Sequence, residues 1–140
     1  MPPESWAKMH GASVHFPIAL VICSGALDAL GRWRRSAAYR PGLRAAGTWT
    51  MLLGALGTVP AVVSGLVMSR GVALGHDTLR LHHLFVWPAF ALIVGLAVWR
   101  VGANPRFENP APAGYLAAVG LATLLVLAAG YWGGELTLGH

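Results

Sequence analysis

Four long apolar segments constrain the fold of this chain more than any other feature of its sequence. Residues 11–31, 45–68, 79–99 and 113–132 each approach the roughly 20 apolar residues that a helix needs to cross a bilayer. Lipid cannot form hydrogen bonds with exposed backbone N–H and C=O groups, so such segments cross the bilayer as α-helices. The chain is 56% hydrophobic and 11% charged, whereas soluble domains are about 25% charged. We therefore expect a membrane protein.

Short polar connections separate these segments. Residues 71–78 join the second span to the third, and residues 102–112, which contain three prolines and two asparagines, read as a turn-rich loop. Links this short place consecutive helices side by side and antiparallel. The sequence thus predicts an all-α fold, a transmembrane up-down-up-down four-helix bundle, formed by a single domain over residues 1–140.

Positive charges predict the orientation of the bundle. Seven arginines fall on one side of the predicted membrane: Arg32, Arg34, Arg35, Arg40, Arg44, Arg100 and Arg106. The other side carries only Lys8, Arg70 and Arg80. Cytoplasmic loops are enriched in Lys and Arg, so both termini are expected outside, in the periplasm or its equivalent. The residues before the first span do not resemble a cleavable signal, and the first helix is expected to direct its own insertion.

Six histidines lie on the outer half of this topology: His10, His15, His76, His82, His83 and His140. Ionisable groups inside a span are costly and tend to face the bundle interior, which makes His15, His82 and His83 functional candidates. His15 and His82 or His83 each lie about one turn inside the start of a span, so their imidazoles reach the same depth. His76, beside Asp77, is interpreted as a loop residue.

A pair of histidines at the same depth in two membrane helices is typical of haem ligation. The first and third helices of an up-down bundle are diagonal partners, and a b-type haem can lie between two opposed neutral imidazoles. His82 and His83 point about 100° apart, so only one of them can face a given centre. The alternative is that these histidines are core residues bonded to backbone carbonyls. The single cysteine, Cys23, excludes an internal disulfide and a C-x-x-C-H site for covalent haem.

A second histidine pair is also conceivable. His10 precedes the first span and His140 follows the fourth, so both lie on the outer face, where they could bind a second haem or remain solvated.

Two further interpretations concern packing. Asp28 lies four residues before Arg32, which predicts an ion pair within one helix. Gly57, Ala61 and Gly65 recur at the spacing of small residues that let membrane helices approach closely.

At these residues the chain resembles a family of small bacterial membrane proteins known as domain of unknown function 2231. The matching segments are His-Gly-Ala-Ser-Val-His-Phe-Pro-Ile-Ala-Leu at residues 10–20, followed by Asp28, the start of the third span around His82, and Gly-Gly-Glu-Leu-Thr-Leu-Gly-His at residues 133–140. The resemblance implies a four-helix unit of the bacterial inner (cytoplasmic) membrane. It also implies that His10, His15, His82 and His140 form the family's histidine set, and it favours His82 over His83.

Relatives in that family look as if they occur joined to Rieske iron-sulfur or cytochrome c modules, which implies electron transfer. The leading hypothesis is therefore a b-type cytochrome with His15 and His82 as axial ligands of haem b, and with Phe16, Phe85 and Trp87 close enough in sequence to pack on the porphyrin. Its expected redox partners are a periplasmic cytochrome c, a Rieske-type protein or a quinol.

Two other hypotheses remain open on the sequence. Met9 and Met68 share the outer side with the histidines, and thioether with imidazole suits copper. The chain could instead be a cofactor-free structural subunit of a larger membrane complex. We find no motif for hydrolysis, phosphate binding or nucleophilic catalysis and no nucleic-acid footprint, so a subunit of an oxidoreductase is a better expectation than a stand-alone enzyme.

Overall fold

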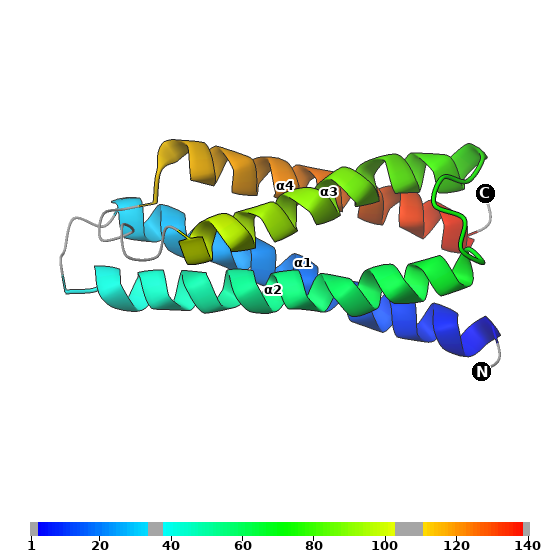
Figure 1. The fold of residues 1–140 in the computed structure, drawn as a ribbon, viewed down its shortest axis with the longest axis horizontal. Helices are drawn as coiled ribbons and strands as arrows, with labels where there is room; N and C mark the ends of the chain where they lie inside the picture. Colours follow the sequence, from blue (N-terminus) through cyan, green and yellow to red (C-terminus); the bar gives the residue numbers. More distant parts are fainter. Residues whose placement is uncertain (1–2, 34–37, 103–110, 139–140) are drawn as a thin grey trace.

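Four antiparallel α-helices make up the fold in the computed structural model, which describes residues 3–33, 38–102 and 111–138 (Figure 1). They are α1 (Pro3–Trp33), α2 (Arg40–Met68), α3 (Asp77–Gly102) and α4 (Ala113–Leu138). The start of α1, the α2–α3 connection and the end of α4 lie at one end of the bundle (Figure 1). The predicted all-α, up-down-up-down transmembrane bundle is confirmed, since all four helices are long and apolar enough to cross a membrane.

The helices extend beyond the apolar spans that the sequence predicts. The largest difference is at α1, which begins at Pro3, well before residue 11. Apolar residues mark only the part of a helix that lies in hydrocarbon, whereas the helix itself can continue through the headgroup layer. As a consequence His10 lies within α1, about two turns after its start, and does not precede the helix.

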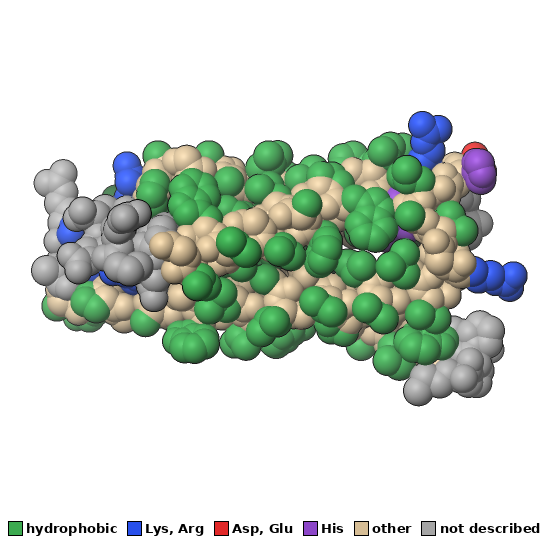
Figure 2. Space-filling model, viewed as in Figure 1, with side chains coloured by type: hydrophobic (Ala, Val, Ile, Leu, Met, Phe, Trp, Pro, Cys, Tyr) green, Lys and Arg blue, Asp and Glu red, His purple; other side chains and the backbone are tan. Residues whose placement is uncertain are grey.

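The outer surface of the bundle is suited to lipid. Figure 2 shows hydrophobic side chains along the whole length of the visible face and Lys or Arg side chains towards the two ends. Leu56 and Leu124 are 67% and 66% exposed, and Trp33 is 86% exposed at the arginine-rich end. Large apolar side chains spread over a whole surface are the arrangement that a hydrocarbon solvent favours.

The bundle consists of two hairpins, α1–α2 and α3–α4, which pack more closely within each hairpin than against one another. Small residues allow the close approach in the first hairpin. A Cβ atom at Gly54 would lie 3.1 Å from a methyl group of Val21, and one at Gly57 would lie 3.0 Å from the Phe16 ring. The notches predicted on the second span therefore do serve helix contact. Val21 and Met51 meet Ile93 and Val119 of the other hairpin in a shared apolar core.

A tight turn ends α2 and sets the direction of α3. The N–H of Gly71 donates to the Leu66 carbonyl over 2.8 Å, and the N–H of Arg70 donates to the Val67 carbonyl over 3.1 Å. These two bonds are the pair that defines a Schellman ending, and Arg70 takes its left-handed position with φ of 54°. The short α2–α3 connection follows at once, so the two hairpins are joined at the end that carries the histidines.

A buried ion pair fastens the hairpins together at the opposite end, and it corrects one prediction. Asp28 pairs with Arg100, 72 positions away on α3, and not with Arg32. Arg100 Nη2 donates to Asp28 Oδ1 over 2.9 Å and to the Arg44 carbonyl over 3.1 Å, and Nε donates to Thr48 Oγ1 over 3.1 Å. Arg32 instead donates to the Ala111 carbonyl over 3.2 Å.

Candidate functional site

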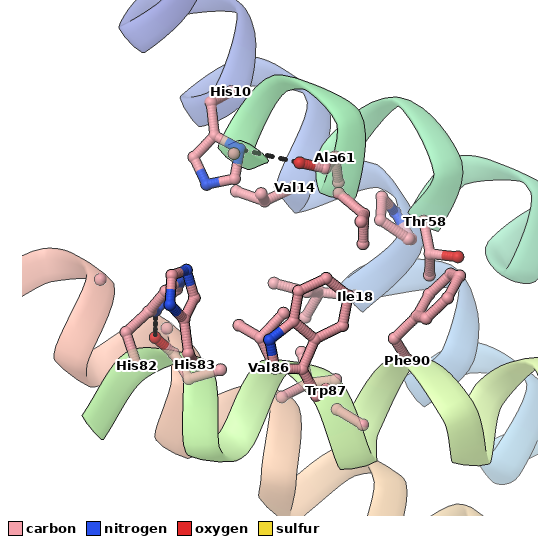
Figure 3. Close-up of a pocket in the computed structure, with 18 of the residues that line it drawn as sticks. His10, Val14, Ile18, Thr58, Ala61, His82, His83, Val86, Trp87 and Phe90 are labelled. Carbon is pink, nitrogen blue, oxygen red and sulfur yellow. Dashed lines mark hydrogen bonds between the residues drawn. The ribbon is translucent and has the colours of Figure 1, made fainter. Parts of the chain in front are cut away.

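A cavity of about 410 Å³ lies between the two hairpins, towards the end where the α2–α3 connection is found. All four helices line it, and most of the lining is apolar: Val14, Ile18, Val86, Trp87 and Phe90 face it in Figure 3. Four histidines contribute to the lining: His10, His15, His82 and His83. Figure 3 shows His10 on one side of the cavity and His82 with His83 on the other, with open space between them.

His10 is held against α2 by its Nδ1 atom. This nitrogen lies 3.0 Å from the carbonyl oxygen of Ala61 and 3.0 Å from Ser64 Oγ. A carbonyl can only accept, so Nδ1 carries the proton and donates it, and Nε2 of the neutral ring keeps its lone pair. The ring also packs closely on the second helix, because a Cβ at Gly65 would be 3.1 Å from His10 Cε1. The structure thus fixes both the orientation and the tautomer of His10.

His82 is held against α4 in the same manner. Its Nδ1 atom donates to the Ala129 carbonyl over 2.8 Å, and a Cβ at Gly133 would lie 3.2 Å from both Cε1 and Nδ1 of the ring. Nε2 is again the nitrogen left with a lone pair. A backbone carbonyl on the far ring nitrogen is the usual support of a metal-bound histidine.

His83 is the most deeply buried histidine of the cavity, with 6% of its surface exposed. Its ring centroid lies 5.7 Å from that of His82 and 6.3 Å from that of Trp87. Among the described residues no hydrogen-bond partner is found for His83 Nδ1. A buried polar atom without a partner is costly, so this nitrogen points to a group that the cavity would receive. Trp87 is fixed in the cavity wall by donating its Nε1–H to the Ala73 carbonyl over 2.7 Å.

The other predicted site residues are placed differently. His15 is exposed at the edge of the cavity, and its Nδ1 donates over 2.6 Å to the carbonyl of Gly11 on its own helix. His76 is exposed immediately before α3. His140 lies outside the described residues, and the predicted pairing of His10 with His140 therefore stays a prediction. The structure therefore brings together His10, His82 and His83 and sets His15 apart from them.

Depth along the helix favoured His15 over His10, whereas rotation around the helix axis favours His10. The buried stripe of α1 runs through Pro17, Val21, Ser24 and Asp28. His10 precedes Asp28 by 18 residues, which is about five full turns, so the two lie on one face. His15 is turned by about 140° from His10 at 100° per residue. The position of Asp28, read as an inward-facing group, was the available signal for choosing His10.

Several side chains invoked for the copper and haem hypotheses are exposed and do not line the cavity. Met9 and Met68, the thioethers proposed for copper, are 46% and 45% exposed. Of the three aromatic residues proposed to pack on a porphyrin, Trp87 lines the cavity, whereas Phe16 packs on Gly57 and is 56% exposed. Within the described part of the chain no group of three or more His, Cys, Asp or Glu side chains is placed to hold a metal ion alone.

A family model described as "Predicted membrane protein (DUF2231)" matches residues 7–140, which include every described residue of the cavity. No curated protein and no solved structure matches the chain.

Proposed function

The chain belongs to the DUF2231 family of predicted membrane proteins, and on that premise we propose that it is a membrane-embedded, b-type cytochrome-like electron-transfer protein. One haem b would bind in the cavity between the hairpins. His10 and His82 would be its axial ligands, and His15, at the edge of the cavity, is the α1 histidine that the proposal replaces.

The main support for this proposal is that two histidines from different hairpins make the same kind of hydrogen bond. Each gives its Nδ1 proton to a backbone carbonyl of the neighbouring helix, Ala61 for His10 and Ala129 for His82. Each therefore keeps an unprotonated Nε2, which is the nitrogen that coordinates iron. Core histidines bonded to carbonyls would satisfy their Nδ1 atoms equally well, but nothing in that alternative requires two of them on opposite walls of an apolar cavity.

The cavity fits a planar cofactor better than a bare ion. Its volume of about 410 Å³ is within the usual range for cofactor sites, and its wall is largely apolar. Haem iron already has four porphyrin nitrogens, so two opposed imidazoles complete its coordination. His83 Nδ1, the buried atom without a described partner, is placed to bond a polar edge of such a group, for example a propionate.

Bound haem would supply reversible one-electron chemistry at iron. The chain's own residues have three tasks around it. His10 and His82 would hold the iron, the apolar wall that includes Val86 and Phe90 would limit water, and the backbone carbonyls behind the histidines would fix their rings. A haem held by these two histidines would supply electron transfer rather than catalysis on a bound substrate.

The depth of the cavity suggests the partner. His10 lies about two turns from the start of α1, so the site is close to the membrane surface on the side of the termini. With the arginine-rich end in the cytoplasm, that surface is the periplasmic side of a bacterial inner membrane. A periplasmic cytochrome c, a Rieske-type protein or a membrane quinol could then exchange electrons with the site, either directly or within a larger complex.

An absorption spectrum of the protein, purified in mild detergent from haem-sufficient cells, tests this proposal. The wild-type chain is expected to carry one haem, with a Soret band and a sharp α band after reduction. The double variant His10→Ala/His82→Ala should lose the pigment, because both of the proposed iron ligands are then absent. His76→Ala removes an exposed loop histidine and is the matched control that should keep the spectrum.

Two results would contradict haem binding. One is a wild-type protein that folds, stays monodisperse and shows no Soret band when haem is supplied during expression and again after purification. The other is a double variant with full wild-type pigment. Stoichiometric copper without iron in elemental analysis would replace the proposal with the copper site, and a stable cofactor-free protein would replace it with a structural subunit.

The proposed orientation is testable separately. A reporter that is active only in the periplasm, fused after residue 140, is expected to be active, whereas the same reporter inserted between residues 35 and 36 should be inactive. A fluorescent protein that matures only in the cytoplasm should give the opposite pattern at both positions. The reverse result would place the cavity on the cytoplasmic side and exclude periplasmic redox partners.

A further inference from the structure

The two hairpins repeat the same set of interactions, although their sequences look unrelated. His82 follows His10 by 72 positions, the separation that also divides Asp28 from Arg100. On the second helix of each hairpin, Ala129 follows Ala61 by 68 positions and Gly133 follows Gly65 by the same number. Thus each hairpin has a histidine bonded to an alanine carbonyl and packed on a glycine one turn further along.

Burial follows the same two offsets. Among residues 5–33 of α1 the buried ones are Pro17, Val21, Ser24 and Asp28, and their counterparts on α3 are Ala89, Ile93, Leu96 and Arg100, all buried. Among residues 113–136 of α4 the buried ones are Tyr115, Val119, Ala122 and Ala129, and their counterparts on α2 are Gly47, Met51, Gly54 and Ala61, again all buried. This agreement is expected if the two hairpins share helix rotation and register, although four further buried residues of α2 and α3, Thr58, Ser64, His83 and Ala97, have counterparts that are not buried.

Exposed positions agree as well. Leu56 and its counterpart Leu124 are 67% and 66% exposed, and Ile22 and its counterpart Val94 are 41% and 37% exposed. Because α1 and α3 run in the same direction, a two-fold rotation around the long axis of the bundle would relate the hairpins. Parallel repeats of this kind, with an axis along the membrane normal, are a known way to build a membrane protein.

Two pairs of counterpart residues locate this axis. Asp28 and Arg100 are counterparts and touch each other, so the axis passes through their ion pair. His10 and His82 are counterparts and face the cavity from opposite sides (Figure 3), so the axis passes between them. On both α1 and α3 the histidine and the charged residue are 18 residues apart, about five turns, which keeps both groups on the axis-facing side of the helix.

We infer that the chain is a pair of equivalent hairpins and that the cavity ligand lies on the two-fold axis between them, held equally by His10 and His82. The second half of this inference rests on the proposed haem function, and the first half does not. A metal on the axis meets the same imidazole nitrogen from each side, so neither histidine is the stronger ligand. His15 has Trp87 as its counterpart and His83 has Gly11, so neither belongs to a symmetric pair.

Spin-label distances on the full chain test the equivalence without any ligand. In a Cys23→Ala background, which removes the exposed native thiol, one sample carries labels at Ile22→Cys and Leu136→Cys and the other at Val94→Cys and Met68→Cys. The two pairs are counterparts, and each spans roughly 25 Å along the bundle. Equal mean distances, within about 3 Å, are expected. A difference of one helical turn or more, about 5.4 Å, would overturn the equivalence.

Ligand spectra test the placement on the axis. In haem-loaded protein, His10→Ala and His82→Ala should each remove one axial ligand and give the same Soret shift, and added imidazole should reverse both. His15→Ala is the matched control on α1 and should leave the spectrum unchanged. If His15→Ala gives the shift while His10→Ala does not, the ligand is off the axis and the axis placement is overturned, although haem binding stands.

The failures of the two proposals are therefore distinguishable. A wild-type chain that never binds haem overturns the proposed function and the ligand half of this inference together, while the spin-label distances still decide whether the hairpins are equivalent. Unequal distances overturn the inference even if the protein is fully loaded with haem.

Discussion

Replacing Arg100 with methionine is expected to destabilise the protein more than any other single change outside the helix backbones. The substitution leaves the Asp28 carboxylate buried, with 3% of its side chain exposed, and without the guanidinium that neutralises it. Breaking a buried pair in this way costs about 3–5 kcal/mol. It also removes donors to Thr48 Oγ1 and the Arg44 carbonyl, so the contact between α2 and α3 is weakened as well. Thermal unfolding in detergent should show a large fall in Tm.

The double variant Asp28→Leu/Arg100→Met is the matched control for this prediction. It removes both charges and fills the space with apolar groups of similar size, which is often neutral or stabilising in a buried site. We therefore expect it to recover most of the lost stability. An Arg100→Met protein as stable as wild type, or a double variant less stable than the single one, would show that the ion pair does not fasten the hairpins.

Replacing Gly65 or Gly133 with valine is expected to have the second largest effect, this time on cofactor binding. A Cβ at Gly65 would lie 3.1 Å from His10 Cε1, and one at Gly133 would lie 3.2 Å from His82 Cε1. The two extra methyl groups of valine would push each ring away from its carbonyl and turn Nε2 out of line. Loss of such a supporting contact lowers metal affinity by about 10–100-fold. Titration of the purified apoprotein with haem measures this effect.

Gly120→Val provides the control for the glycine variants. Gly120 is exposed on the same helix as Gly133, and nothing lies within 4 Å of a Cβ built on it. Valine there should bind haem with wild-type affinity, because the side chain would project into lipid. Equal affinity in all three variants would mean that the histidine rings do not need their glycine neighbours, and it would remove one support from the proposed site.

The equivalence of the two hairpins extends to the effects of substitutions. Changes at counterpart positions, such as Gly65 and Gly133, should have similar effects, because each pair occupies equivalent places around one axis. The ion pair departs from this rule, since the two counterparts carry opposite charges and bind each other. Opposite charges at positions that meet on the axis attract, whereas two identical charges there would repel in a medium of low dielectric constant.

Local properties of the sequence were sufficient to predict the general architecture. The length and hydrophobicity of residues 45–68 or 79–99 indicate a membrane helix whatever surrounds them, and the short link at residues 71–78 makes its neighbours antiparallel. The depth of the histidines followed in the same way, since depth depends only on the count of residues from the end of a span. Each of these predictions concerns position along a helix and not rotation around the helix axis.

Rotation of each helix about its own axis was decided only by the tertiary structure. Asp28 has an arginine one turn away on its own helix, yet it pairs with Arg100, 72 positions along the chain, because packing of α1 on α2 and of α3 on α4 turns those two groups inward. The same rotation brings His10 to the cavity and leaves His15 at its edge. Hydrophobicity cannot fix this angle when lipid and core are both apolar, so close packing of small residues and the buried ion pair between Asp28 and Arg100 fix it instead.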